Sequence, residues 1–330
     1  MSIFEKMGFS DLELGEEILS VEEMTLIPIK KKPGTGRDIT EVVADPEAVN
    51  FRGNQSYGEM SFRNDDSRPA IINSNTMVIS DKAAQDHAMS GPGIVLSNSS
   101  KRFTNCCCIQ QSQGGHLEGD DERNHYDILP IFLRKKLLSK SLRKQNKFGK
   151  LWNDITEFTK CVHGRGRGHL EDFFRDQRVS EQLSEFVAEF EPTQHQIGAV
   201  ILFNQRIVGI EIQPTVKHWL HYWEWFIRGC YGADLVRNRL LPKYVARPLD
   251  VPLPDDLNKC LSSVKQSVLR FRSDVSDTIV NGIIPNLKGD QPKQVNRTNL
   301  SSQLLTSQNG GGDLIVDSAA SQAIYLSLIL

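Results

Sequence analysis

Three consecutive polar residues, Gln85, Asp86 and His87, could together perform acid–base or phosphate chemistry. An aspartate can orient a neighbouring imidazole, and an imidazole changes protonation near neutral pH. His87 could therefore act as a base or bind a phosphate. In the alternative interpretation, the three side chains cap backbone groups of a polar loop. We expect the triplet to face a ligand-binding hollow in the N-terminal part of the chain.

The cysteines offer a second kind of chemistry. Cys108 would be a nucleophile if a neighbouring cation lowered the pKa of its thiol. Cys106, Cys107 and Cys108 are consecutive. Adjacent residues of a strand point to opposite faces, which suits neither a disulfide nor a zinc site. The pattern therefore predicts free thiols in a reducing compartment, with Cys107 or Cys108 buried.

A glycine-rich loop at residues 164–168 carries Arg165 and Arg167. Glycine allows close backbone approach, and arginine makes bidentate contacts with phosphate oxygens. No strand precedes the loop, and its spacing matches neither a Walker A loop nor a dinucleotide fingerprint. An anion site and an exposed linker both remain open. His163 and His169 flank the loop, but two histidines do not make a metal site, and we predict none.

Eight basic residues and no acidic one lie between Arg134 and Lys150. Such a run can dock nucleic acid or an acidic partner. We favour a solvated helix face balanced by the acidic residues 119–122. The net charge of -2 gives no reason to expect nucleic acid as an obligatory partner.

Aromatic residues recur at three- and four-residue spacing between Trp219 and Phe226. This spacing is typical of a helix that buries one face, so we interpret the stripe as core. Stacking on a base or sugar is the alternative.

The N-terminal part of the chain reads as short strands separated by turns. This pattern favours an antiparallel sandwich or a barrel-like sheet. We expect residues 113–126 to form an exposed connection. The predicted strands are Met24–Ile29, Ile39–Val43, Tyr57–Phe62, Pro69–Asn73, Met77–Ser80, Ile94–Leu96 and Phe103–Gln110.

The C-terminal part reads as helices and two strand pairs. Apolar spacing predicts helices over Leu129–Lys160, Leu170–Phe186 and Asp255–Val280. One hairpin turns at Asn204-Gln205, and a second pairs Asp313–Asp317 with Ala323–Leu328. The two hairpins could pair into one sheet.

The fold class is therefore α+β, with an antiparallel β-rich half and then a helical and mixed half. We divide the chain into a lead-in (1–23), the β-rich half (24–127) and the mixed half (128–330). The last two could form one continuous domain. No apolar run approaches the roughly 18 residues of a spanning helix, and the start lacks a secretory pattern. We expect a cytoplasmic protein that does not enter a membrane.

Short fragments in this order resemble one protein family. They run from Met24–Ile29 through Asp38-Ile39-Thr40-Glu41-Val42, Asn64–Ile72, Ala84–His87 and Cys108–Gln111 to the hairpin Gly198–Ile212 and the strand Ile324–Leu328. Together they are similar to the ARPP family, the ARG and rhodanese-phosphatase-superfamily-associated protein domain. The chain departs from the family pattern at Asn73-Ser74-Asn75, where an acidic turn is usual. It also departs at His87, where arginine is usual, and at Gln110, where glutamate is common.

The resemblance implies a role near ADP-ribose or related nucleotide metabolism, because the family name records association with ADP-ribosylglycohydrolases and rhodanese-like phosphatases. The favoured hypothesis is binding or processing of an ADP-ribose-like ligand. The alternative is a non-catalytic interaction or scaffold protein that works with a neighbouring enzyme, with a protein partner or as a homo-oligomer. No cofactor follows from the sequence. The ligand-binding candidates are Gln85, Asp86, His87, Gln110, Arg165 and Arg167, and the catalytic candidates are Asp86, His87 and Cys108.

Overall fold

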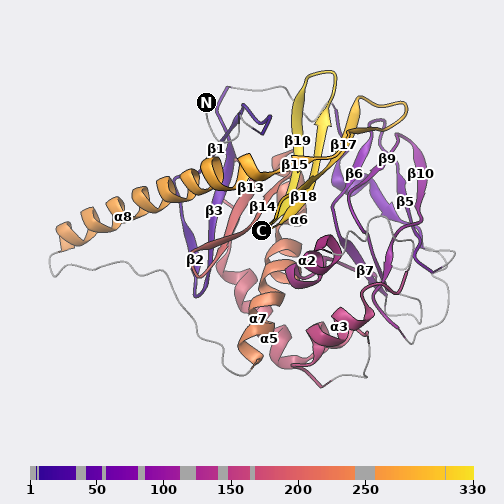
Figure 1. Cartoon of the computed structure of the whole chain (residues 1–330), viewed down its shortest axis with the longest axis horizontal. Helices are drawn as coiled ribbons and strands as arrows, with labels where there is room; N and C mark the ends of the chain where they lie inside the picture. Colours follow the sequence, from indigo (N-terminus) through magenta and orange to yellow (C-terminus); the bar gives the residue numbers. More distant parts are fainter. Residues whose placement is uncertain are drawn as a thin grey trace.

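Strands from both ends of the chain meet in one large antiparallel sheet (Figure 1). The computed structural model describes residues 5, 7–34, 42–53, 57–80, 86–111, 124–139, 148–163, 168–241, 257–308 and 310–330. The strand order is β1-β3-β13-β14-β19-β18-β17-β15, with β2 also paired to β3 and β16 to β17. The strands are β1 (Leu12–Leu14), β2 (Leu19–Val21), β3 (Met24–Lys31), β13 (Gln196–Phe203), β14 (Arg206–Ile212), β15 (Lys288–Gly289), β16 (Lys293–Gln294), β17 (Leu300–Thr306), β18 (Gly311–Asp317) and β19 (Gln322–Ile329).

The two predicted hairpins are confirmed, and they pair with each other through β14 and β19. The first hairpin turns at Asn204 and Gln205, which both have positive φ angles of 47° and 67°. That backbone matches the right-handed twist of the flanking strands. β3 pairs with the other edge of β13. The sequence did not predict this pairing.

Three smaller antiparallel sheets lie beside the C-terminal strands, as Figure 1 shows. Their orders are β10-β5-β4, β11-β8-β7-β12 and β6-β9. The strands are β4 (Val49–Phe51), β5 (Met60–Asn64), β6 (Ala70–Ile72), β7 (Thr76–Ser80), β8 (His87–Ala88), β9 (Gly93–Val95), β10 (Ser99–Phe103), β11 (Cys107–Cys108) and β12 (Asn124–Ile128). The antiparallel β-rich half is therefore confirmed.

Two details of that half differ from the expectation. Phe103–Gln110 is not one strand, because β10 ends at Phe103 and only Cys107–Cys108 pairs again. Residues 124–128 are not an exposed connection, because β12 pairs with β7 and buries Asp127 and Ile128. Most of the predicted strand Ile39–Val43 lies outside the described residues.

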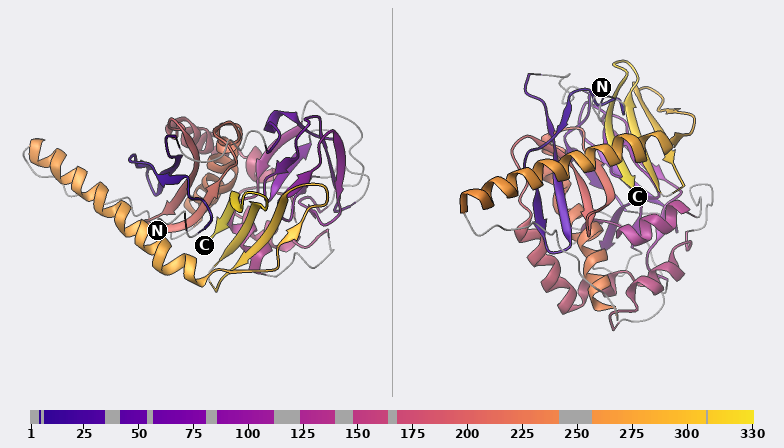
Figure 2. Two further views of the ribbon diagram at one scale, coloured as in Figure 1. Left: turned by 90° about the horizontal axis from the view of Figure 1, so that it is seen from above. Right: turned by 60° about the vertical axis from the view of Figure 1, so that its left-hand side comes forward.

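Helices lie on both faces of the large sheet (Figure 2). The predicted helix Leu129–Lys160 is two helices within the described residues, α2 and α3. The helices are η2 (Pro46–Ala48), α2 (Ile131–Ser139), α3 (Trp152–Thr159), α4 (Glu171–Arg175), α5 (Gln177–Glu189), α6 (Val216–Glu224), the π-helix η4 (Trp225–Gly232), α7 (Ala233–Leu240), α8 (Leu257–Asp277), the π-helix η5 (Thr278–Ile283) and η6 (Ile284–Asn286).

The large sheet has a separate apolar core on each face. In β3, Leu26 belongs to the core beneath α2–α7, and Ile27 belongs to the core beneath the C-terminal end of α8. In β13, Ile201 belongs to the core beneath α2–α7, and Val200 belongs to the core beneath the C-terminal end of α8. Successive strand residues point to opposite faces, so a strand covered on both faces needs a continuous apolar run. This explains the unbroken apolar sequence of β13.

The aromatic stripe is core, as predicted. Trp219, Tyr222 and Phe226 are all buried, and the rings of Trp219 and Phe226 stack at 5.8 Å. From Trp225 to Gly232 the helix widens into a π-helix, which the spacing did not predict. π-helical turns often occur at functional sites, and two residues of this one contact the polar cluster described below.

A buried histidine lies at the start of α6. Nδ1 of His218 is 2.8 Å from Oγ1 of Thr215, and the same hydroxyl caps α6 by accepting from the backbone N–H of His218. Burial lowers the pKa of His218 to about 4. A histidine in the unfolded chain titrates near 6.5, so the unfolded state binds the additional proton between these two values.

The stability that depends on His218 is therefore present above pH 6.5 and is lost as the pH falls towards 4. We expect the free energy of unfolding to fall by about 2 kcal/mol from this cause between pH 7 and pH 5. Urea unfolding at both pH values measures the loss, and His218→Gln should show a correspondingly smaller one. His163→Gln, at an exposed position, is the control. Equal losses in the wild type and His218→Gln would contradict the prediction.

Candidate functional site

A row of polar residues crosses the middle of the large sheet. Asp313 of β18 lies directly opposite Ser327 of β19, and Ser327 lies directly opposite Glu211 of β14. Residues opposite one another in antiparallel strands share a face. All three are buried, with 5%, 1% and 0% of their surface exposed. A buried carboxylate needs hydrogen-bond donors or a cation.

The cation is Arg134 of α2, which is only 1% exposed. Its Nη1 donates to Oε1 of Glu211 at 2.8 Å and to Sγ of Cys230 at 3.1 Å, and its Nη2 donates to Oγ of Ser327. Its Nε donates to Oδ1 of Asn75 at 3.2 Å. Burial opposes the charge, but Glu211 outweighs it and the pKa of Arg134 is raised. The expectation of a solvated basic face is therefore wrong for Arg134.

A glycine lets one more donor reach Glu211. Tyr231, from the π-helix, donates its hydroxyl to Oε1 of Glu211 at 2.8 Å. A Cβ built on Gly209 would lie 2.0 Å from that hydroxyl oxygen. The Gly-x-Glu spacing in β14 therefore has a physical cause: only glycine leaves room for the phenol beside the carboxylate.

We call Arg134, Glu211, Ser327 and Asp313 the polar cluster. The turn at residues 73–75 connects this cluster to the β-rich half. The backbone N–H of Ser74 donates to the hydroxyl of Tyr325 at 2.9 Å, and Oγ of Ser74 donates to Oδ2 of Asp313 at 2.5 Å. Asn75 has a positive φ of 61°, a conformation that asparagine tolerates better than most residues. Although the turn lacks the acidic residues of the family pattern, it thus supports the carboxylate of Asp313.

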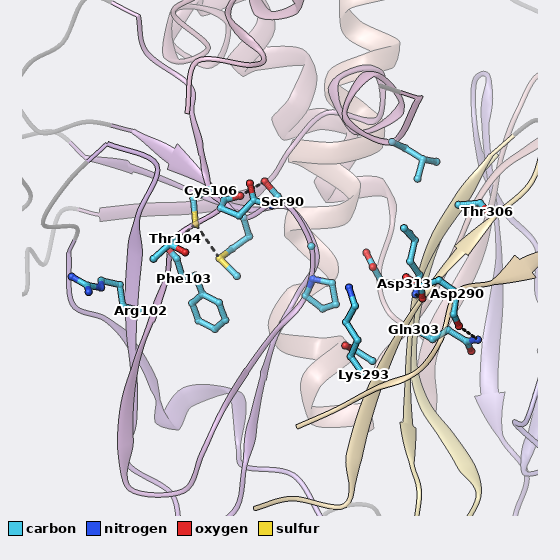
Figure 3. Close-up of a pocket in the computed structure, with 17 residues that line it drawn as sticks. Ser90, Arg102, Phe103, Thr104, Cys106, Asp290, Lys293, Gln303, Thr306 and Asp313 are labelled. Atoms are coloured by element: carbon cyan, nitrogen blue, oxygen red, sulfur yellow. Dashed lines mark hydrogen bonds between the residues drawn. The ribbon is translucent and has the colours of Figure 1, made fainter. Parts of the chain in front are cut away.

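Asp313 also lines a cleft of about 610 Å³ between the β-rich half and the C-terminal strands. Figure 3 shows the two walls: Ser90, Arg102 and Phe103 lie on one side, and Gln303 and Asp313 lie on the other. Leu138, one helical turn after Arg134, completes the lining from α2. The same helix therefore contacts both the cleft and the polar cluster.

Both walls of the cleft carry charge. Lys293 of β16 extends into the space between them (Figure 3). It is exposed and has no ion-pair partner among the described residues. The side chain of Arg102 is 54% exposed and lies 3.7 Å from Oε2 of Glu59. Asp290 is exposed, and its Oδ1 accepts from the backbone N–H of Leu304 at 2.8 Å. The cleft thus offers two cations and two carboxylates.

A protein-family profile matches most of the chain. The profile of the ARG and Rhodanese-Phosphatase-superfamily-associated Protein domain, ARPP-1, matches residues 11–279, well over half of the chain. The chain belongs to the ARPP-1 family. No curated protein and no solved structure matches it.

The ARPP-1 match covers only part of the site. Arg134, Glu211 and the turn at residues 73–75 lie within it, whereas Asp313 and Lys293 lie after it. The resemblance of Ile324–Leu328 to the closing family strand also lies beyond the matched residues. The cleft therefore joins a wall from the ARPP-1 match to a wall that follows it.

Asp86 and His87 of the predicted polar triplet do not line the cleft. Asp86 and His87 are both 0% exposed, and Gln85 lies outside the described residues. Nε2 of His87 accepts from the backbone N–H of Gly58 at 3.0 Å. The backbone carbonyl of Asp86 accepts from the N–H of Ile109 at 2.9 Å.

The structure does bring other candidates to the same place. Cys108 pairs with His87 across β11 and β8, and its thiol donates to the backbone carbonyl of Gln110 at 2.8 Å. Burial raises the pKa of the Cys108 thiol to about 11, which opposes a nucleophilic role at neutral pH. Nε2 of Gln110 donates to Oε2 of Glu171 at 3.3 Å. Arg165 and Arg167 lie outside the described residues.

Two absences hold for the part of the chain that the structure describes. No group of three or more histidine, cysteine, aspartate or glutamate side chains is placed to hold a metal ion. No described helix is both long enough and apolar enough to span a membrane. Among the described residues, Cys106, Cys107, Cys108, Cys161 and Cys230 are free thiols, as predicted.

Sequence reasoning missed Arg134 and Glu211, although a signal was present. Glu211 is a single carboxylate within the apolar sequence Ile207-Val208-Gly209-Ile210-Glu211-Ile212. A lone acid in a strand buried on both faces implies a cationic partner. Arg134 lies three residues from both Ile131 and Leu137, and therefore on the apolar face of its own helix.

The Arg134–Glu211 pair yields a test of stability. Arg134→Met leaves the carboxylate of Glu211 buried without its cation. Such a change lowers the free energy of unfolding by about 3–5 kcal/mol. The double variant Arg134→Met/Glu211→Gln should lose less free energy of unfolding than the two single variants lose in sum. Urea unfolding measures each variant. Arg178→Met removes an exposed arginine paired with Asp176 and should stay close to the wild type. An Arg134→Met variant as stable as this control would refute the argument.

Proposed function

We propose that this ARPP-1 protein binds a nucleotide-derived ligand of the ADP-ribose kind in the cleft between β10 and β16–β18. The observation that carries the proposal is the pairing of exposed cations with a buried carboxylate in one small-molecule-sized cleft. Its volume of about 610 Å³ lies within the range of roughly 300–1,000 Å³ that is usual for ligand sites.

Each part of such a ligand has a chemical counterpart in the cleft. The diphosphate suits Lys293 and Arg102, because ammonium and guanidinium groups form charge-assisted hydrogen bonds with phosphate oxygens. Sugar hydroxyls suit the carboxylate of Asp313 as an acceptor. The ring of Phe103 offers a face for a base, and the nearby Gly93 makes room for that ring, because a Cβ there would lie 2.6 Å from it.

The proposal is one of binding. Cys106 lines the cleft, but burial raises the pKa of its thiol and makes it a poor nucleophile. Asp86, His87 and Cys108 lie in the interior beside the cleft wall, where they support β8 and β11. The association of ARPP-1 with ADP-ribose enzymes that the family name implies supports the same class of ligand.

Titration calorimetry with ADP-ribose tests this proposal. We expect the wild type to bind, and Lys293→Gln to bind about tenfold more weakly, because a lost charge-assisted contact corresponds to roughly 1.5 kcal/mol or more. Lys288→Gln removes another exposed lysine of the same sheet that does not line the cleft, so its affinity should be unchanged. Absence of wild-type binding to ADP-ribose and to ADP would overturn the proposal.

A second candidate function, self-association, is favoured by the shape of α8. Figures 1 and 2 show this helix extending well beyond the edge of the large sheet. Its apolar residues alternate four- and three-residue steps at positions 257, 261, 264, 268, 271 and 275, which is the heptad pattern of a coiled coil. Val275 packs in the core and Phe271 packs against it, and Val268 lies one three-residue step before Phe271 on the same side of α8. The occupant that fits this stripe is α8 of a second copy.

Light scattering during size exclusion tests the second function. We expect a dimer that dissociates in Val268→Glu, because a charge at a core heptad position must be desolvated. Gln266→Glu places the same charge on an exposed position of α8 and should remain a dimer. A wild type that stays monomeric at high concentration would exclude this function.

A further inference from the structure

We propose that Phe103 makes the cleft selective for ligands that carry an aromatic base, and that Lys101 and Gly93 are positioning residues that hold its ring. This inference deepens the proposed function and rests on it. It also gives the ligand one orientation, with the base against β10 and the phosphates towards Lys293.

The cleft offers a base one ring to stack on. Among the described residues that line the cleft, Phe103 is the one aromatic residue. It is the last residue of β10 and is partly exposed, and Figure 3 shows its ring on the wall that the β-rich half forms. Stacking on an aromatic ring is open to every base, because every base has a π-face, and it is closed to ligands that carry none.

The pairing of β10 with β5 holds the ring from one side. Phe103 lies directly opposite Met60, so Phe62 is its diagonal neighbour on the same face. The rings of Phe62 and Phe103 meet edge to face, with 6.1 Å between their centroids and 70° between their planes. This arrangement is favourable for aromatic pairs and stabilises one tilt of the Phe103 ring.

Lys101 lies over the same ring. Alternation along the strand places Lys101 and Phe103 on one face of β10, and Nζ of Lys101 is 4.9 Å from the ring centroid. The ammonium is itself held, because it donates to the backbone carbonyl of Ile94 at 2.9 Å. A cation over the face of a ring is attracted to its π electrons. Lys101 therefore orients the ring, whereas Lys293, which lines the cleft, is placed to contact phosphate.

Gly93 leaves the space that the ring occupies. A Cβ built at this position would lie 2.6 Å from Cζ and 2.9 Å from Cε1 of Phe103. Carbon atoms in contact are about 3.5–4.0 Å apart. The backbone of Gly93 is paired with Ile72 of β6, so alanine at this position would push the ring aside rather than move the strand.

These three contacts order the ring before a ligand arrives. An ordered ring loses little conformational freedom when a base stacks on it, so more of the stacking energy appears as affinity. The phosphate contact with Lys293 is available to every phosphorylated ligand, whereas stacking is available to those with a base. The cleft should therefore prefer nucleotides to sugar phosphates.

The first test changes the ligand and uses the wild-type, full-length protein. Calorimetry compares AMP with ribose 5-phosphate, which carries a hydroxyl in place of the base. We expect AMP to bind about tenfold more tightly or better, because stacking of a base contributes that much. A protein that binds ADP-ribose but binds AMP and ribose 5-phosphate equally would overturn the inference and leave the proposed function intact. Absence of binding to ADP-ribose and to ADP would overturn both.

The second test changes the stacking ring. Phe103→Leu should abolish most of the preference for AMP, while its affinity for ribose 5-phosphate stays nearly unchanged. Tyr57→Leu removes an exposed aromatic ring of the same half that does not line the cleft, and it should keep the wild-type preference. An equal loss of affinity for both ligands in Phe103→Leu would indicate a purely structural role and refute the assignment.

The positioning residues are tested by the same ratio of affinities. Gly93→Ala should reduce the preference for AMP several-fold, whereas Gly282→Ala adds a Cβ where nothing lies within 4 Å and should keep it. Lys101→Met should also reduce the preference, without weakening ribose 5-phosphate. Weaker binding of ribose 5-phosphate to Lys101→Met, or an unchanged preference in Gly93→Ala, would contradict the positioning roles. Thermal melting confirms that each variant is folded.

Discussion

The fold is constrained by one buried charge pair, Arg134 and Glu211. A carboxylate in the middle of a sheet covered on both faces is stable only if a cation and further donors reach it. Two separate segments supply these partners: α2 supplies Arg134, and the π-helix supplies Tyr231. Ser327 of β19 accepts a further hydrogen bond from Arg134. The position of α2 over the sheet is therefore set by polar contacts as well as by apolar packing.

The same constraint extends to the cleft. Arg134 holds Asn75 on one side and Ser327 on the other, and Asp313 lies between Ser74 and Ser327. The interior network thus ends at Asp313, a buried carboxylate that lines the cleft. The π-helix has a related role, because its wider turn contributes both Cys230 and Tyr231 to the neighbourhood of one glutamate. The proposed ligand binding would consequently depend on the residues that stabilise the fold.

Local patterns predicted the local elements well. The Asn204-Gln205 hairpin, the aromatic stripe of α6 and the closing hairpin followed from turn residues and periodicity, which act over a few positions. The site did not follow, because its contacts are distant in sequence. Ser74 and Asp313 are separated by 239 positions, and the character of Asp313 depends on that contact. Arg134 was misjudged because composition cannot distinguish one buried arginine from seven other basic residues in the same run.

The central position of β19 affects how the chain acquires its structure during synthesis. Until this strand leaves the ribosome, β14 is an open edge, and Glu211 has only part of its final surroundings. Pairings between such distant segments form slowly, and exposed sheet edges can associate with other chains. The nascent protein should therefore depend on protection of β14 until β19 has been synthesised, and a product truncated before β19 would be a substrate for chaperones rather than a smaller working domain.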